Sequence, residues 1–204
     1  MARPSKPMDH ERRARLFNAA AAEFARGYEA ASLNSILTQA GVSKSSFYHF
    51  FSDKEELFDI LSEAAIADFS NRIELPDPGN LMAEDYWDRI RDVVVKLGEA
   101  TIEGSSSQWL ADLFYVDDAP ASGPLATFRN DIRTWISEVT ARGREIGTVI
   151  TDLPLDLQVD LTWAIILVVN NYVTNQDDPA MASQVIWQAV AQFLPENGEF
   201  TRLG

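Results

Sequence analysis

The 204-residue chain has no cysteine and only two histidines. Without cysteine, neither a disulfide nor a thiolate metal site can form, which suits a reducing cytoplasm. His10 and His49 have no metal ligand at a suitable spacing, and the sequence has no glycine-rich phosphate loop or nucleophile elbow. We therefore expect no enzyme, no metal site and no cofactor.

Long apolar runs and leader-like segments are also missing. The most apolar stretch, Leu161 to Val173, is shorter than the roughly 20 residues that a membrane helix needs. Residues 1–13 are polar and lack the apolar segment of a signal peptide. These features predict a soluble, cytoplasmic protein without a membrane partner.

The strict alternation of apolar and polar residues that marks a strand is absent, and helical periodicity fills the stretches between breaks rich in proline and glycine. Beyond residue 72, the pattern predicts helices over 83–103, 107–116, 124–145, 155–175 and 180–194. Four more helices are expected in the first 72 residues, the last of them from about Glu55 to Arg72. The prediction is an all-α fold of about nine helices. Asp117-Asp118 and Asp177-Asp178 stand beside the breaks and are expected to be turn residues on a solvated surface.

Residues 32–51 have the pattern of two short helices joined by a glycine turn. The first helix has an apolar face at helical spacing, formed by Leu33, Ile36, Leu37 and Ala40. Ser32 stands where its N-cap belongs, and Gly41 ends it. Val42 is then expected to be buried in the turn, and Ser43 to cap the second helix.

The second helix separates aromatic from polar positions. Phe47 and Phe51 are four residues apart and are expected to face inward, which turns Lys44 and Tyr48 outward. Small, basic and aromatic side chains on such an outward face contact phosphates and base edges of duplex DNA. The sequence thus predicts a helix-turn-helix whose DNA contacts come from Ser32, Asn34, Ser43, Lys44, Ser45, Ser46, Tyr48, His49 and Lys54.

Residues 40–58, AGVSKSSFYHFFSDKEELF, resemble the N-terminal motif of the TetR family of transcriptional regulators. The similarity extends upstream through Leu16, Phe17, Ala20, Phe24 and Gly27-Tyr28. Ser45 departs from the family, which most often has glycine there, so the base preference is expected to differ. The resemblance implies a three-helix DNA-binding head, residues 1–54, and a helical body, residues 55–204, that binds an effector and dimerises.

The charge is unevenly distributed along the chain. Residues 1–54 contain eight Lys/Arg and five Asp/Glu, a net charge of +3, whereas the remaining 150 residues carry −17. Because phosphate neutralisation is the main source of DNA affinity, this distribution favours DNA binding by the head alone. Arg3 and Lys6 of the N-terminal arm are candidates for contacts with the DNA backbone or minor groove.

The helix containing Leu161 to Val173 is apolar on nearly all sides, so it must be buried against other helices on two of them. Burial in the centre of a monomer would provide it, and so would a homodimer, which we favour because two half-sites one turn apart need a two-fold protein. The resemblance implies a four-helix interface built from the last two helices. The expected interface residues are Ile165, Val168, Val185, Ile186, Ala189, Val190 and Phe193.

The body is also rich in aromatic residues, most of which are expected to be core. The resemblance implies an apolar ligand cavity, for which the candidate lining residues are Trp109, Phe128, Trp135, Trp163, Asn170 and Asn171. The two asparagines lie within an apolar helix and need hydrogen-bond partners, which a ligand, the dimer partner or a neighbouring backbone group could provide.

These features together predict a DNA-binding transcriptional regulator, a repressor released from operator DNA by a small-molecule effector. Two alternatives remain open on the sequence. One is a helical ligand-binding or protein-interaction module that does not bind DNA, and the other is a transcriptional activator of the same fold.

Overall fold

A computed structural model describes residues 8–102, 105–174 and 188 of the chain. Over these residues the protein forms eight α-helices and no strand, which confirms the predicted all-α fold. The helices are α1 His10–Phe24, α2 Leu33–Ala40, α3 Lys44–Phe47, α4 Lys54–Arg72, α5 Tyr86–Ile102, α6 Ser105–Phe114, α7 Pro124–Glu145 and α8 Leu155–Thr174. A short 3-10 helix, η1 Pro78–Asn80, precedes α5. The helix expected over 180–194 lies outside the described residues.

The chain divides into two compact units, each built from two segments of sequence. The first comprises residues 1–70 and 103–129, and the second residues 71–102 and 130–204. The first unit therefore contains α1 to α4, α6 and the first turn of α7. The sequence predicts a different kind of boundary after residue 54, between DNA binding and effector binding. That functional division stays a prediction.

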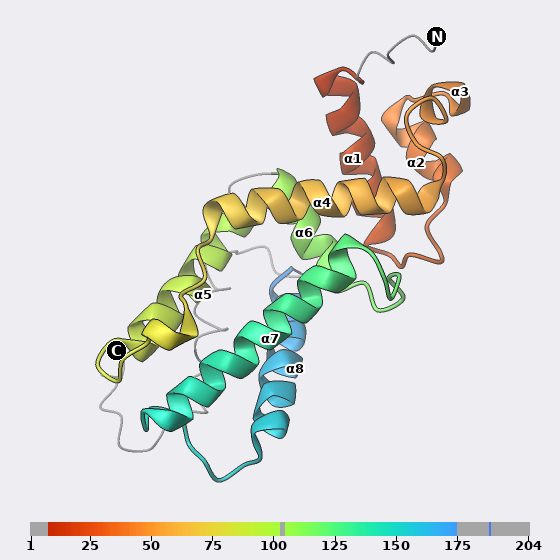
Figure 1. Cartoon of the computed structure of the whole chain (residues 1–204). Coiled ribbons are helices and arrows are strands. Elements are labelled where there is room, and N and C mark those ends of the chain that lie inside the picture. Colours follow the sequence, from red (N-terminus) through yellow and green to blue (C-terminus); the bar gives the residue numbers. More distant parts are fainter. Residues whose placement is uncertain (1–7, 103–104, 175–187, 189–204) are drawn as a thin grey trace, which may run out of the picture. The chain divides into compact units, whose positions relative to one another are not determined.

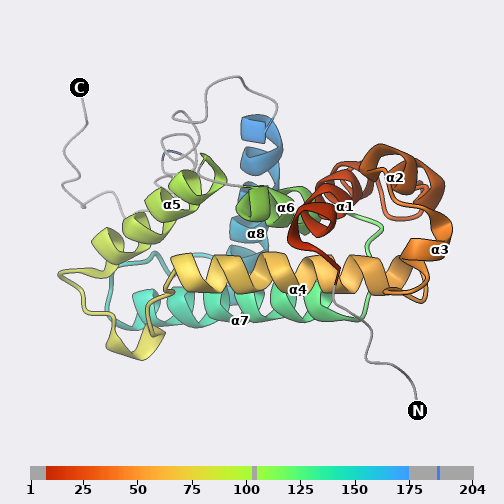
Figure 2. The ribbon, with the colours of Figure 1, turned by 90° about the horizontal axis from the view of Figure 1, so that it is seen from above.

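Aromatic and aliphatic side chains of α1, α2 and α4 form the core of the first unit. Figure 1 shows α2 and α3 beside α1 at one end of the long helix α4, and α1 also packs against α6 (Figure 2). The ring of Phe24 meets that of Phe58 edge-on, with 4.9 Å between centroids. The most buried large side chains here include Leu16, Phe17, Phe24, Ile36, Phe47, Leu57, Phe58 and Leu61. Truncating such a side chain to alanine typically costs about 2 to 5 kcal/mol.

The second unit has its own core, in which the buried Tyr86 hydroxyl is hydrogen-bonded. The cluster consists of Leu81, Tyr86, Val139 and Val149, flanked by Trp87, Ile90, Trp135 and Ile146. The Tyr86 hydroxyl donates to the carbonyl of Val139 at 3.0 Å, and burial raises the pKa of this hydroxyl. Gly143 makes this packing possible, because a Cβ there would lie only 2.6 Å from the Tyr86 hydroxyl oxygen. Within the part of the chain that is described, no helix has the length and apolar composition of a membrane span.

Candidate nucleic-acid interface

Glu23, near the end of α1, holds the start of α2. Its buried carboxylate accepts the backbone N–H of Ser32 at 3.1 Å and the hydroxyl of Ser35 at 3.1 Å. Ser32 is the N-cap of α2, as predicted, and its hydroxyl accepts the N–H of Ser35. A carboxylate is stabilised at a helix N-terminus, where the first N–H groups lack helical partners. The end of α1 thus sets the position of α2.

The turn between α2 and α3 has the predicted form. Gly41 adopts the left-handed conformation, with φ 65° and ψ 35°, which a side chain would disfavour. The N–H of Val42 then bonds back to the carbonyl of Leu37 at 3.0 Å, and the Val42 side chain is buried. Ser43 caps α3 by accepting the N–H of Ser46 at 3.2 Å. This turn places α3 directly after α2.

Helix α3 and the turn that follows it separate a buried aromatic side from an exposed polar side. The rings of Phe47 and Phe51 stack with 5.2 Å between centroids, and both side chains are buried. Tyr48 is 57% exposed, an unusual degree for so large a ring. We call the exposed residues Lys44, Ser45, Tyr48 and His49 the reading face. Ser32, Asn34 and Ser43 are also exposed, whereas Ser46 is half-buried.

Helix α3 is shorter than the sequence pattern suggested. Only Lys44–Phe47 is helical, although the pattern extended to Phe51. The N–H of Phe50 bonds to the carbonyl of Phe47 at 2.8 Å, so the chain continues as a tight turn. The physical reason is the aromatic run after Ser46, since aromatic side chains lose rotamer freedom in a helix and favour it weakly.

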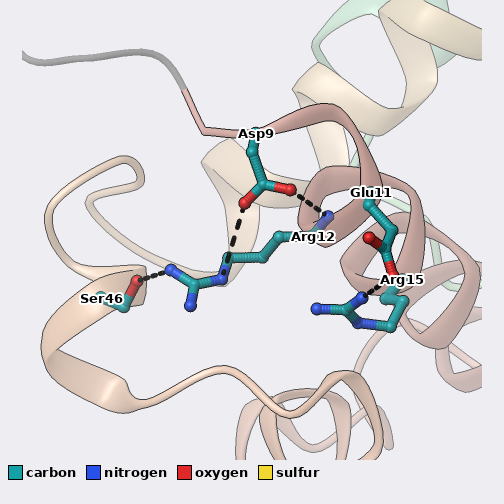
Figure 3. Close-up of polar contacts among 5 residues, drawn as sticks. All are labelled: Asp9, Glu11, Arg12, Arg15 and Ser46. Atoms are coloured by element: carbon teal, nitrogen blue, oxygen red, sulfur yellow. Dashed lines mark hydrogen bonds and ion pairs between the residues drawn. The ribbon is translucent and has the colours of Figure 1, made fainter.

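Arg12 of α1 lies next to this helix, which no sequence motif indicated. Its Nη1 donates to the Ser46 hydroxyl at 3.4 Å, and its Nε lies 4.0 Å from a carboxylate oxygen of Asp9 (Figure 3). One turn further along α1, Arg15 is paired with Glu11 at 2.7 Å. The Arg12 side chain remains 43% exposed. A guanidinium held beside α3 in this way is placed to meet a DNA phosphate.

Lys54, the first residue of α4, turns toward the protein. Its Nζ donates to the carbonyl of Tyr28 at 2.7 Å and more weakly to that of Ala31 at 3.4 Å. The same Nζ lies 4.4 Å from the centroid of the Tyr28 ring. An ammonium group has three N–H donors, so a phosphate contact by Lys54 would use the third. That contact stays a prediction.

Residues 16–61 match the sequence model described as bacterial regulatory proteins, tetR family. The match spans the end of α1, the whole of α2 and α3, and the start of α4. Over this segment the chain is similar to the TetR family. Members of that family are DNA-binding transcriptional regulators, and the reading face lies inside the matched segment. Among curated proteins, none matches the chain significantly.

Solved structures of transcriptional regulators share the fold over most of the chain. A TetR family regulator from Chloroflexus aurantiacus J-10-FL is 21% identical, with TM-score 0.66 over 91% of this chain and 86% of that one. The ketosteroid transcriptional regulator KstR2 of Mycobacterium tuberculosis is 23% identical, with TM-score 0.65 over 91% and 94%. FadR of Bacillus subtilis, solved in complex with stearoyl-CoA, is 19% identical, with TM-score 0.57 over 87% and 97%.

The predicted pocket residues fall in both compact units. In the first, the indole N–H of Trp109 donates to the Asn18 side chain at 2.8 Å, and Phe128 packs on Phe69 with 5.2 Å between centroids. In the second, the indole N–H of Trp135 donates to the carbonyl of Pro76 at 2.9 Å, and Trp163 is half-buried on α8. The side chains of Asn170 and Asn171 lie outside the described residues. A shared pocket stays a prediction.

The predicted dimer residues are described only on α8. There Ile165 is half-buried and Val168 is 68% exposed. Val185, Ile186, Ala189, Val190 and Phe193 lie outside the described residues, as do Arg3 and Lys6 of the N-terminal arm.

Asp118 is an exposed turn residue, as predicted, and it also makes a contact that the sequence did not indicate. Its carboxylate accepts the backbone N–H groups of Tyr28 at 2.7 Å and Glu29 at 2.9 Å. These two bonds hold the pKa of Asp118 below its usual value. No local pattern could reveal the contact, because the partners are 90 residues apart in sequence.

Proposed function

We propose that this TetR-family protein is a homodimeric repressor that binds operator DNA through the reading face and leaves it when a small, largely apolar ligand occupies the body. The observation that carries the proposal is the exposure of Lys44, Ser45, Tyr48 and His49 over the buried rings of Phe47 and Phe51. A 57% exposed tyrosine ring gains area by contact with bases or sugars, and Lys44 adds a charge for phosphate.

Charge supports the assignment of DNA to the head. Residues 1–54 carry +3 and the rest of the chain −17, so a polyanion is attracted only by the head. Arg12 adds to this surface from α1, since it already reaches the Ser46 hydroxyl.

Helix α8 supports the homodimer. It exposes apolar side chains that are four and seven residues apart, with Leu157 42%, Leu161 37% and Val168 68% exposed. Positions separated by four and seven residues lie on one side of a helix, so these side chains form a stripe along α8. A two-fold dimer is also what an operator with two half-sites about 34 to 36 Å apart requires.

The ligand-controlled step is supported by relatives of the same fold. FadR of Bacillus subtilis was solved with stearoyl-CoA, and KstR2 is named a ketosteroid regulator. The acyl chain of stearoyl-CoA and the ring system of a ketosteroid are both apolar, which suits a body that contains Trp109, Phe128, Trp135 and Trp163. Repression and ligand release fit the general scheme in which a ligand selects a conformation that binds DNA less well.

Selection of duplexes from a random DNA pool tests the DNA-binding part of the proposal. The full-length protein should enrich a palindromic sequence with two half-sites one helical turn apart. A fluorescent duplex carrying that sequence should bind more tightly than a scrambled duplex at the same salt concentration. If the selection enriches no particular sequence, the protein does not recognise an operator and the proposal is overturned.

A further inference from the structure

We infer that Asp118 is a positioning residue for DNA binding, because it ties the loop between α6 and α7 (residues 115–123) to the turn that joins α1 to α2 in the DNA-binding head. The inference rests on the proposed function and names the part of the body that sets the conformation of the head. Loop and turn belong to the same compact unit, although the loop lies far from the head in sequence.

The geometry of the contact is that of a carboxylate with two convergent donors. One oxygen, Oδ1, accepts the N–H of Tyr28 at 2.7 Å, and the other, Oδ2, accepts the N–H of Glu29 at 2.9 Å. Glycine suits position 27 of this turn because its φ of 120° disfavours a side chain. Bonds from N–H groups to an ionised carboxylate are stronger than those between neutral groups.

The opposite side of the same turn is held by α4. Lys54 donates to the carbonyls of Tyr28 and Ala31 and lies over the Tyr28 ring. The turn is therefore held through its N–H groups by Asp118 and through its carbonyls by Lys54. Because α1 ends and α2 begins at this turn, the two contacts fix how α2, and with it α3, stands on α1.

The loop that carries Asp118 is itself anchored to α7. The guanidinium of Arg129 donates to the carbonyls of Leu113, Phe114 and Val116, where α6 ends. A shift of α6 or of the first turn of α7 thus moves the loop and the Asp118 carboxylate with it. The loop therefore connects α6 and α7 to the turn between α1 and α2.

Asp118→Asn tests this role, because asparagine keeps the size of the side chain but has one acceptor oxygen where two are used. Asp117→Asn is the matched control, since it removes the same charge from the neighbouring exposed residue. Charge alone predicts tighter DNA binding for both variants, because each loses a negative charge. The positioning role predicts the opposite for Asp118→Asn, about tenfold weaker binding to the selected duplex than Asp117→Asn.

Amide hydrogen exchange separates positioning from general stabilisation. In the wild type, the selected duplex should slow exchange in residues 116–123 as well as in the head, whereas in Asp118→Asn the slowing should stay within the head. Asp118→Glu keeps the charge and should restore part of the DNA affinity and part of the slowed exchange in residues 116–123. If circular dichroism shows that Asp118→Asn is unfolded, Asp118→Glu takes its place in the affinity and exchange measurements. Equal DNA affinity of the Asp118 and Asp117 variants would overturn the positioning role, while failure of the wild type to bind any duplex would overturn the proposed function itself.

Discussion

At the scale of single residues, the predicted head has exposed side chains, which we propose as the DNA contacts, and is held in shape by others. Lys44 and Tyr48 are exposed, whereas Glu23 and Asp118 each accept two hydrogen bonds that fix an end of α2 or the turn before it. Arg12 does both, since its guanidinium reaches the Ser46 hydroxyl and is still 43% exposed. A phosphate oxygen would be a stronger acceptor for it than a serine hydroxyl.

Replacing Arg12 with alanine should weaken operator binding and lower the dependence of affinity on salt. One lost phosphate contact reduces the slope of log affinity against log salt by about 1. Titrations at four salt concentrations measure this slope. Arg89→Ala, which removes an arginine paired with Asp85 on α5, is the control and should leave the slope unchanged. An Arg12→Ala slope equal to that of the wild type would show that the guanidinium serves only to hold Ser46.

Local residue roles were predictable, and distant ones were not. Ser32, Gly41 and Ser43 work within three to five residues of their own position, so the sequence alone identified them. Glu23 pairs with residues nine and twelve positions away, and Asp118 with residues about ninety away. Helical periodicity contains no information about such pairs, which depend on how α1, α2 and the loop after α6 come together.

At the scale of elements, boundaries marked by proline or glycine were predicted closely. Helix α7 spans Pro124–Glu145, as expected, and α8 spans Leu155–Thr174 against the predicted 155–175. Helix α6 begins at Ser105, two residues earlier than predicted, and ends at Phe114. At this end the guanidinium of Arg129, which lies on α7, donates to the carbonyls of Leu113 and Phe114. The sequence of α6 alone does not contain this contact.

Helix α8 gives a test of the homodimer. Val168→Glu places a charge in the exposed apolar stripe and should separate the subunits, because burying an unpaired charge costs several kcal/mol. Val95→Glu on α5 introduces the same charge at another exposed valine, and this variant should still sediment with the mass of a dimer. Analytical ultracentrifugation at micromolar concentration measures both. A wild-type protein that sediments as a monomer would refute the dimer.

At the scale of the whole molecule, the predicted head packs with a segment from the middle of the chain. The first compact unit joins residues 1–70 with residues 103–129, so α6 and the loop after it share a core and hydrogen bonds with α1 and the turn that follows it. The N-terminal motif allowed the DNA-binding part to be predicted by itself. Its union with residues 103–129 could not be, because it depends on tertiary contacts.

Ligand release predicts a reciprocal coupling between two sites. A ligand found by thermal shift of the full-length protein should lower operator affinity roughly 5- to 150-fold, the range expected for coupling of about 1 to 3 kcal/mol. By linkage, the operator must weaken binding of that ligand by the same factor. Calorimetric titration of the ligand, with and without the selected duplex, measures the second effect. Tight ligands that leave operator affinity unchanged would assign the body to dimerisation alone.

The most direct test of the reading face is the operator affinity of Lys44→Ala and Tyr48→Ala, measured by fluorescence anisotropy at one salt concentration. Lys96→Ala, which removes the same charge from an exposed position on α5, is the control. We expect each reading-face variant to lose about 1 to 3 kcal/mol of binding free energy while circular dichroism stays unchanged, and Lys96→Ala to bind like the wild type. Wild-type affinity in both reading-face variants would contradict the account.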